Sequence, residues 1–342
     1  MRSERRTQLY AEEQPEMKDS YGREIDYLRI SVTDRCNLRC RYCMPEGIDK
    51  LPMPDLLTYE EIEETARAAA RLGFRKLKVT GGEPLVRRNV PELIGILKRI
   101  PGIREVTVTT NGTLLAEQIG ALKAAGLDAV NVSLDTLRPE RFREITGTDA
   151  LASVLEGIQA SLDAGIRTKL NAVLQRGVND DEWEELLLLA KDRALDVRFI
   201  EMMPIGAGRQ TAGVSNEALI GQIARAYPLI RADEEVHGNG PAVYMHIPGF
   251  TGSVGFISAI HGKFCDSCNR LRMTSTGLIK PCLCYGDTVD VRGILRGEGD
   301  PAVRAWKLEE ALREAVRRKP EAHCFETVSE ITEGKRMVQI GG

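Results

Sequence analysis

Three cysteines lie close together near the start of the chain, in the stretch DRCNLRCRYCMP. Cys36, Cys40 and Cys43 have the spacing CxxxCxxC, and no histidine lies near them in the sequence. Structural zinc is normally bound by four Cys or His ligands, so zinc here would need a distant fourth ligand. In a four-iron cluster, three thiolates leave one iron open to a substrate or cofactor. The three cysteines therefore favour an iron–sulfur cluster with an open iron over structural zinc.

A second set of three cysteines lies in the C-terminal part of the chain. Cys265 and Cys268 form a CxxC pair, and Cys282 follows after thirteen intervening residues. This set also lacks an evident fourth ligand, which predicts a second cluster with an open iron. Cys284 is an alternative to Cys282 as the third ligand, whereas Cys324 has no evident role. The scattered histidines are assigned no metal or catalytic role: His237, His246, His261 and His323.

Alternating strands and helices surround the first cysteine set. Runs rich in β-branched residues predict six strands, at 26–32, 75–80, 105–110, 129–134, 168–174 and 197–202. Helical patterns lie between them, at 59–72, 91–100, 114–125, 150–164 and 181–193. Such βα units form a parallel sheet, either an incomplete barrel or an open doubly wound sheet. Because the first cysteines follow the first strand, they are placed at the carboxyl ends of the strands, where barrel active sites lie.

The regular alternation ends in a Gly-rich stretch, GAGRQTAG, about two thirds of the way along the chain. With 342 residues, 42% of them hydrophobic, the chain is long enough for one large domain or two ordinary ones. We expect residues 1–20 to form a flexible N-terminal extension and residues 21–245 a partial barrel. Residues 246–342 are expected to form a C-terminal region with the second cysteine set and a last helix near 302–318.

The charge and the cysteines of the chain restrict its setting. A formal net charge of −3 argues against general binding to nucleic acid or to a membrane surface. Neither end carries a signal sequence or an apolar run long enough to span a bilayer, which predicts a cytoplasmic protein. In a reducing cytosol, clustered cysteines are metal ligands more often than disulfides.

Basic residues interrupt several of the predicted strands. In the run RKLKVT, alternation places Lys76, Lys78 and Thr80 on one face and the two apolar residues on the other. Buried charges without a partner are costly, so an anionic ligand is expected in the lumen. The first, fifth and sixth strands contain Arg29, Lys169 and Arg198. Each basic residue alone also fits a solvated face, but several converging on one lumen favour a ligand.

Two motifs together resemble those of a known superfamily. Tyr42 precedes the last cysteine of CxxxCxxC, and Gly81-Gly82-Glu83-Pro84 follows the second predicted strand. Both are similar to motifs of the radical S-adenosylmethionine (SAM) enzymes. The resemblance implies an α/β fold, an incomplete (βα)6 TIM-type barrel, with SAM bound at the open iron. It also implies reductive cleavage of SAM to methionine and a 5′-deoxyadenosyl radical that abstracts hydrogen from a substrate.

Further motifs narrow the resemblance to one family. LRISVTDRCNLRCRYCMP, TGGEPL, CDSCNRLR and the terminal Gly-Gly resemble the GTP 3′,8-cyclases of molybdenum cofactor biosynthesis over nearly the whole chain after residue 20. The resemblance implies two 4Fe–4S clusters, the second of which binds the purine, and conversion of GTP to (8S)-3′,8-cyclo-7,8-dihydroguanosine 5′-triphosphate. It also implies an external electron donor, a homodimer and transfer of the product to cyclic pyranopterin monophosphate synthase.

The resemblance also assigns roles to particular residues. The cluster ligands are Cys36, Cys40, Cys43, Cys265, Cys268 and Cys282. The SAM contacts are Tyr42, Gly82, Ser133 and Met203. The GTP contacts are Arg29, Lys76, Lys78, Thr109, Lys169, Arg198, Arg270, Leu271 and Arg272. Catalytic roles fall on Arg29, Arg270, Arg272, Gly341 and Gly342, the last two in a tail that enters the active-site pocket. The family commonly has Arg at the position of Lys78, whose ammonium lacks the bidentate fork.

Two other functions share part of this pattern. One is a different radical SAM enzyme with an auxiliary cluster, such as a peptide maturase, and the other is an iron–sulfur electron carrier. The Gly-Gly-Glu-Pro motif argues against a carrier, which needs no SAM pocket. The Asn269-Arg270-Leu271-Arg272 segment and the Gly-Gly tail argue against a maturase. The basic run Arg317-Arg318-Lys319 is expected to be a solvated helix end.

Overall fold

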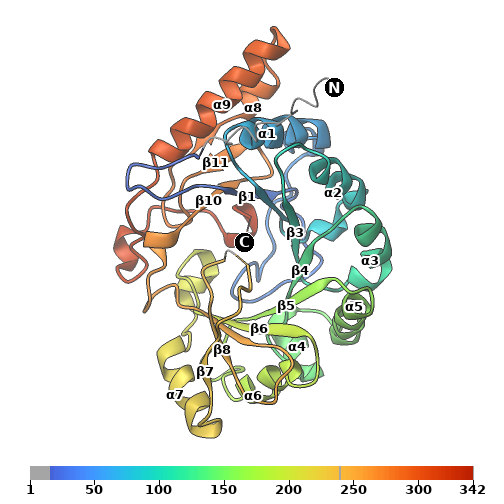
Figure 1. The fold of residues 1–342 in the computed structure, drawn as a ribbon, viewed down its shortest axis with the longest axis vertical. Helices are drawn as coiled ribbons and strands as arrows, with labels where there is room; N and C mark the ends of the chain where they lie inside the picture. The colour runs from blue at the N-terminus through green and yellow to red at the C-terminus, as the bar shows by residue number, and fades with distance from the viewer. Residues whose placement is uncertain (1–15, 239, 342) are drawn as a thin grey trace, which may run out of the picture.

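A curved sheet lies at the centre of the molecule, with helices around its outer side (Figure 1). The computed structural model describes residues 16–238 and 240–341. Within these ranges the sheet has 12 strands, in the order β12-β11-β10-β1-β2-β3-β4-β5-β6-β9-β8-β7. The order is linear, so the sheet is an incomplete barrel. Residues 1–15, which make up most of the expected N-terminal extension, and the terminal Gly342 lie outside the described residues.

The six strands predicted from the sequence are all present. They lie side by side in chain order, and each pairs in parallel with the next. Their bounds are β1 (Tyr27–Ser31), β2 (Lys76–Thr80), β3 (Glu105–Thr110), β4 (Ala129–Ser133), β5 (Arg167–Ala172) and β6 (Leu195–Ile200). This order confirms the (βα)6 barrel, because a doubly wound sheet would reverse its strand order at a switch point.

Most helices also match their predicted positions. The helices are α1 (Tyr59–Arg71), α2 (Val90–Lys98), α3 (Leu115–Ala124), α4 (Pro139–Thr146), α5 (Leu151–Asp163), α6 (Trp183–Leu187), α7 (Asn216–Ala226), α8 (Arg292–Leu295) and α9 (Pro301–Arg317). The sequence does not predict α4, α7 or α8, and α6 is much shorter than the expected 181–193. The short α4 and α8, of 8 and 4 residues, give too little hydrophobic periodicity to be distinguished from loops.

The C-terminal region extends the sheet at both edges. Strand β10 (Arg270–Met273) pairs in parallel with β1, and β9 (Val254–Ile257) pairs in parallel with β6. The remaining strands are antiparallel additions: β7 (Arg231–Ala232), β8 (Val243–His246), β11 (Leu278–Lys280) and β12 (Val289–Asp290). The expected boundary between residues 245 and 246 falls within β8, so the barrel and the C-terminal region share one sheet.

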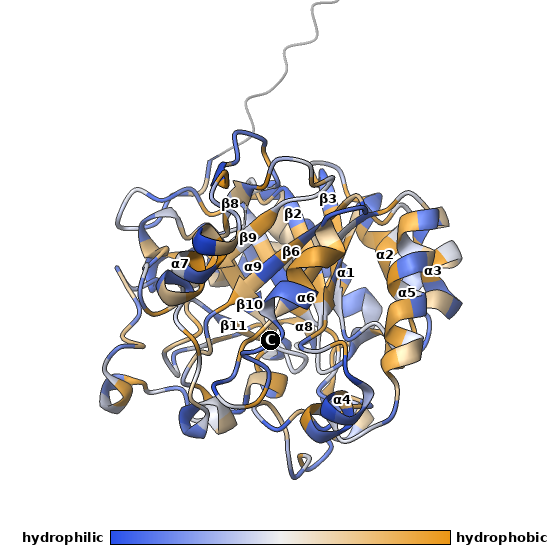
Figure 2. Ribbon diagram, turned by 90° about the horizontal axis from the view of Figure 1, so that it is seen from below, coloured by the Kyte–Doolittle hydropathy of each residue, from blue (hydrophilic) through white to orange (hydrophobic). Residues whose placement is uncertain are grey.

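The main apolar core lies between the sheet and its helices. Helix α1 begins with a capping box, in which the Thr58 hydroxyl accepts from the amide of Glu61 and the Glu61 carboxylate accepts from the amide of Thr58. Its buried face includes Ile62, Ala66 and Ala69. Figure 2 shows hydrophobic residues concentrated in the central strands and on helices next to them. This packing fixes the strands whose carboxyl ends carry the site.

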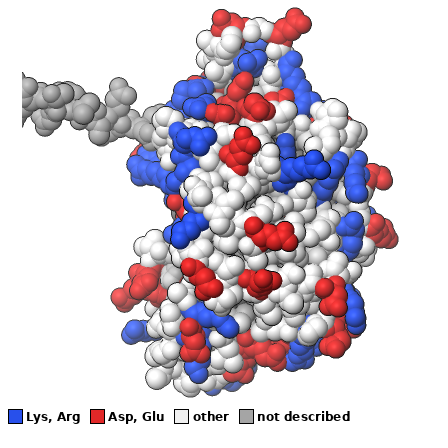
Figure 3. Space-filling model, turned by 90° about the vertical axis from the view of Figure 1, so that its right-hand side faces the viewer, with Lys and Arg blue, Asp and Glu red and all other residues white. Residues whose placement is uncertain are grey.

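The outer surface carries both signs of charge. Figure 3 shows Lys and Arg interspersed with Asp and Glu over the face in view. Pairs such as Arg71–Glu309 and Arg304–Glu64 join α9 to α1, at 2.6 and 2.9 Å. Among the described residues, no helix has the length and apolar character to cross a membrane.

Candidate active site

A cavity of about 370 Å³ lies at the carboxyl ends of the barrel strands and reaches into the lumen. Both cysteine sets lie on its wall: Cys36, Cys40, Cys43, Cys265, Cys268 and Cys282. The first set follows β1, and the second lies around β10, which is the neighbour of β1 in the sheet. The parallel pairing of these two strands therefore brings together two sets that are far apart in the sequence.

The loop of the first cysteine set is held against the end of α4. The amides of Arg39 and Arg41 donate to the carbonyl oxygens of Thr146 and Ile145, at 2.7 and 2.9 Å. These two hydrogen bonds fix the loop against α4. Burial raises the pKa of Cys43 to about 12, so the thiol is protonated until a metal displaces the proton.

The donor chemistry of both sets fits a cluster better than a single ion. Each set has three thiols, one fewer than the four ligands that structural zinc normally takes. In a four-iron cluster, by contrast, each thiolate binds a different iron. Soft thiols around an open space suit iron–sulfur chemistry and not a hard cation.

Gly82 brings the end of β2 into close contact with the cysteine loop. A Cβ at this position would overlap the carbonyl oxygen of Arg35, so the loop accepts only glycine here. The Gly82 amide donates to the carbonyl oxygen of Thr33 at 2.7 Å. Gly82 lines the cavity, and its lack of a side chain lets its backbone pack directly against that of residues 33–35.

Glu83, the next residue, is a buried link between β2 and β3. Its carboxylate accepts from the Thr110 hydroxyl at 2.7 Å and from the amides of Asn111 and Leu85 at 2.6 and 3.0 Å. Burial raises the pKa of Glu83 to about 7, although these donors favour the ionised form. The Gly-Gly-Glu-Pro motif thus positions the strand ends around the cavity.

Asp135 is a cavity residue that the sequence analysis does not identify. Its Oδ2 accepts from the Tyr42 hydroxyl at 2.7 Å, and its Oδ1 accepts from the Val173 amide at 2.8 Å. Burial raises the pKa of Asp135 to about 6, although these two hydrogen bonds favour the ionised form. Ser133 lies two residues earlier on the same wall. A polar residue just after a buried barrel strand is the signal that points to Asp135.

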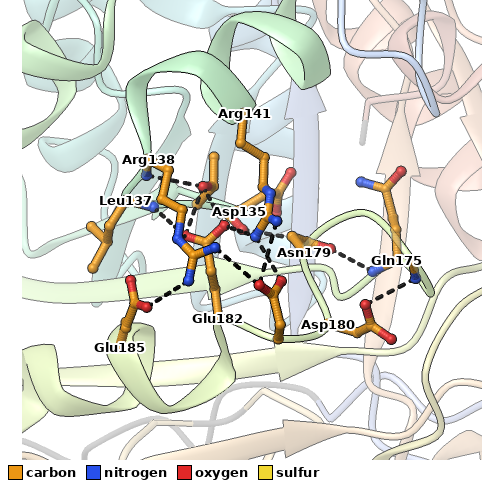
Figure 4. Close-up of polar contacts among 12 residues, drawn as sticks. Asp135, Leu137, Arg138, Arg141, Gln175, Asn179, Asp180, Glu182 and Glu185 are labelled. Atoms are coloured by element: carbon orange, nitrogen blue, oxygen red, sulfur yellow. Dashed lines mark hydrogen bonds and ion pairs between the residues drawn. The ribbon is translucent and has the colours of Figure 1, made fainter.

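A polar network holds the loop that carries Asp135 (Figure 4). Asn179 donates from Nδ2 to the Asp135 carbonyl oxygen at 2.7 Å. The buried Glu182 carboxylate accepts from the Thr136 hydroxyl at 2.7 and 2.8 Å and from the Leu137 amide at 3.0 Å. Glu182 directly precedes α6, and a 3-10 turn at Leu188–Ala190 follows α6 at once, so the expected helix 181–193 is cut short mainly at its end.

Three cationic side chains lie in register across neighbouring strands. Arg29 on β1 is the partner of Lys78 on β2 and of Arg272 on β10. Desolvation lowers the pKa of Lys78 and of Arg272 well below their usual values, and the Arg29 guanidinium adds to both shifts. Cations that repel one another in a desolvated site are stabilised by an anion. The register therefore builds an anion-binding wall.

Arg198 and Arg270 add to this wall from β6 and β10. Both line the cavity, and each has a buried Nε without a hydrogen-bond partner in the described part of the chain. Buried donors of this kind are normally satisfied, so they fit a ligand with several acceptor oxygens. Thr109 lies on the same wall, from β3.

Three expected substrate residues lie outside the cavity wall. Lys76 forms an ion pair with Asp26 at 3.6 Å near the amino end of β2. Lys169 donates to the Tyr244 hydroxyl at 2.9 Å, and burial lowers its pKa to about 8. Leu271 is fully buried and points away from the face that carries Arg270 and Arg272. Their substrate contacts stay predictions.

The two candidates for the third ligand of the second cysteine set lie in different surroundings. Cys282 lines the cavity with Cys265 and Cys268. Cys284 is fully buried in a small apolar cluster, where its Sγ lies 3.2 Å from that of Cys324. This geometry favours Cys282 as the third residue of the set.

The C-terminal tail ends against residues of the neighbouring strands β10, β1 and β2. Arg272 donates from Nη1 to the Gly341 carbonyl oxygen at 3.3 Å. Gly341 has φ +77°, and a Cβ there would lie 3.0 Å from that of Ser31. Met337 and Val338, earlier in the tail, line the cavity. Gly341 thus lies beside the anion-binding wall.

The expectation of a solvated helix end is wrong for Lys319. The Arg317 and Arg318 side chains are 58% and 50% exposed, whereas Lys319 is 4% exposed. The chain turns inward after α9 and carries Lys319 to 3.5 Å from the Sγ of Cys268. Local sequence carries no sign of this turn.

Comparisons with known proteins cover nearly the whole chain. The family model described as "Radical SAM superfamily" matches residues 30–190, and that described as "Molybdenum Cofactor Synthesis C" matches residues 195–325. Proteins named GTP 3′,8-cyclase from Pelotomaculum thermopropionicum and Moorella thermoacetica are each 46% identical to this chain, over 95% of it and 100% of the relative. That of Geobacter sulfurreducens is 43% identical, over 96% of this chain and 100% of its own.

Solved structures support the fold. Streptococcus suis SuiB, crystallised with S-adenosylmethionine, superposes with a TM-score of 0.61 at 14% identity, over 92% of this chain and 77% of SuiB. The protein anSMEcpe, solved with bound AdoMet, gives a TM-score of 0.55 at 13% identity, over 87% of this chain and 93% of its own. At such identities the likeness concerns the fold alone.

Proposed function

The chain belongs to the GTP 3′,8-cyclase family, and on this premise we propose that it converts GTP to (8S)-3′,8-cyclo-7,8-dihydroguanosine 5′-triphosphate, the first step of molybdenum cofactor biosynthesis. One observation carries the proposal. A single cavity is lined by two sets of three cysteines and by a group of cationic side chains. An electron carrier has no use for such a cavity, and the cations suit a polyanionic substrate.

The cysteines and their neighbours form the cofactor sites in this proposal. Cys36, Cys40 and Cys43 hold one 4Fe–4S cluster, and Cys265, Cys268 and Cys282 hold the other. When bound, SAM and the first cluster supply the 5′-deoxyadenosyl radical that removes a hydrogen atom from the ribose of GTP. The SAM pocket comprises Tyr42, Gly82, Ser133 and Met203, all of which lie on the cavity wall beside the first cysteine set.

The cationic wall orients the triphosphate. Arg29, Lys78 and Arg272 present three neighbouring positive groups, so the phosphates are held at several points and the ribose has a defined position. Lys78 binds as a point charge, and the bidentate contacts come from the arginines. Arg270 and Arg198 supply the unsatisfied Nε donors. Thr109 contributes a hydroxyl from the same wall.

Product analysis tests the proposed reaction. The chain is reconstituted anaerobically with iron and sulfide and incubated with SAM, dithionite and GTP. We expect mass spectrometry to find 5′-deoxyadenosine and an isomer of GTP, and a Cys36→Ala chain to form neither. 5′-Deoxyadenosine without a GTP isomer would indicate a different radical SAM reaction. Stoichiometric zinc without iron–sulfur absorbance would contradict the cluster assignment.

The remaining proposals concern the cellular setting. We infer an external electron donor, because reductive cleavage of SAM consumes electrons that the chain does not itself supply. We also infer transfer of the product to cyclic pyranopterin monophosphate synthase, a homodimer and a cytoplasmic location. The eight free cysteines support a reducing compartment. Pull-down with the synthase tests the transfer of the product. Sedimentation of the purified chain tests the homodimer.

A further inference from the structure

We propose that Lys319 is the counter-cation of the second cysteine set. Its ammonium group, hydrogen-bonded to the sulfur of Cys268, sets the reduction potential of the cluster held there. This inference rests on the proposed function, because it requires a cluster at Cys265, Cys268 and Cys282. Lys319 is then a residue that tunes and positions the cluster, without touching the substrate.

The contacts of Lys319 fit a charged ammonium group. Its Nζ lies 2.9 Å from the carbonyl oxygen of Arg270, 3.1 Å from that of Pro281 and 3.5 Å from the Sγ of Cys268. An ammonium group has three N–H donors, and these three acceptors use all of them. A neutral amine has only two N–H donors and would leave one acceptor without a bond. The geometry therefore fits the protonated form.

In the described part of the chain, Lys319 has no anionic partner other than sulfur. Within residues 16–238 and 240–341, Lys319 forms no ion pair with a carboxylate, and the anionic groups that act on it are Cys268 and Cys282. A buried cation without a counter-charge costs several kcal/mol. A cluster held by these sulfurs would supply that counter-charge.

The segment that carries Lys319 is fixed next to the cysteines. Arg23 donates to the carbonyl oxygen of Cys265 at 2.9 Å and to those of Glu321 and Pro320 at 2.7 and 2.6 Å. This buried guanidinium joins the segment after α9 to the second cysteine set and forms an ion pair with Asp19 at 2.6 Å. Lys319 therefore has little freedom to move away from Cys268.

A second hydrogen bond to sulfur comes from the same segment. The backbone amide of His323 donates to the Sγ of Cys265 at 3.4 Å. Two of the three sulfurs thus accept N–H groups from residues 319–323. Hydrogen bonds to the sulfurs and the charge near a cluster are among the factors that set its potential. A nearby cation favours the reduced cluster, which carries one more negative charge, so loss of the Lys319 charge should make the potential more negative.

The test uses the full chain with Cys36, Cys40 and Cys43 all replaced by Ala, so that only the second cluster forms. Lys319→Met and Lys319→Gln remove the charge, Lys319→Arg keeps it, and Arg318→Met removes the exposed neighbouring charge as a matched control. Each chain is reconstituted anaerobically, its iron is counted, its fold is checked by circular dichroism, and the midpoint potential is measured by EPR-monitored titration. We expect a more negative midpoint for Met and Gln, and little change for Arg and for Arg318→Met.

The outcomes separate the inference from the proposed function. A loaded Lys319→Met or Lys319→Gln chain with an unchanged midpoint overturns the inference. Loss of the cluster from Lys319→Arg as well as from the neutral variants also overturns it, because packing and not charge would then matter. Loss of the cluster from folded Lys319→Met and Lys319→Gln chains, with the cluster kept in Lys319→Arg, supports the inference. If the parent chain with three Ala substitutions binds no iron, the second cluster itself is refuted, and the inference with it.

Discussion

Arg272 donates from Nη1 to the carbonyl oxygen of Gly341 at 3.3 Å inside the barrel. The guanidinium also lies in register with Arg29 and next to Arg270, in the proposed triphosphate site. One side chain therefore contacts the tail and forms part of the anion-binding wall. We therefore expect a change in the tail to affect the substrate site through this contact.

We expect Gly341→Ala to lose the cyclised product while it keeps its iron and still cleaves SAM. At φ +77° an alanine is strained by about 1 kcal/mol, and its Cβ would press on Ser31 at 3.0 Å. Product, 5′-deoxyadenosine, iron and melting temperature are measured together. Gly334→Ala is the control, since that position has open space around it. Full cyclisation by a chain that ends at Ile340 would show that the tail is dispensable.

Replacement of Arg270 or Arg272 by Ala should raise the KM for GTP. A charge-assisted contact to phosphate contributes roughly 1.5–3 kcal/mol, so we expect an increase of about 10- to 100-fold. Both iron sites should stay loaded, because neither guanidinium is a ligand. Arg231→Ala, on the exposed β7, is the matched control. Unchanged GTP kinetics in the double variant would mean that the two charges do not bind substrate.

Removal of Cys282 and removal of Cys284 should have different effects on iron content. Cys282→Ala is expected to lose about half of the iron, since one of two four-iron sites is broken. Cys284→Ala should keep all of it, because that thiol lies against Cys324 and away from the cavity. Iron and sulfide analysis of the two variants side by side decides the assignment. The reverse result would make Cys284 the ligand.

The buried Glu83 should make stability depend on pH in the metal-free chain. Its pKa rises from 4.5 to about 7 on folding, so its contribution is fully present below about pH 4.5 and is lost as the pH rises through 7. The lost contribution amounts to ~3 kcal/mol by linkage. Denaturant unfolding between pH 4.5 and 7.5 should show a flatter profile for Glu83→Gln than for wild type. Glu156→Gln, on the surface of α5, should keep the wild-type slope.

Much of this protein is determined by local sequence. The six barrel strands are recognisable because β-branched runs and helical periodicity act over short stretches of chain. The two cysteine sets and the cation-bearing strand RKLKVT are recognisable because ligand spacing and strand alternation are also local. These patterns are sufficient for a parallel sheet of βα units, and they predict cluster ligands and an anionic ligand, whereas the choice of an incomplete barrel came from the family resemblance.

Tertiary structure alone decided how these parts meet. The pairing of β10 with β1 places Arg272 beside Arg29, although the two strands are separated by most of the chain. The same long-range packing buries Lys319 against Cys268 and turns Cys284 away from the cavity, while its neighbour Cys282 lines it. No periodicity encodes such contacts, because they depend on which distant surfaces pack together. Whether a lysine is a solvated helix end or lies against a cysteine sulfur is therefore settled only by its three-dimensional surroundings.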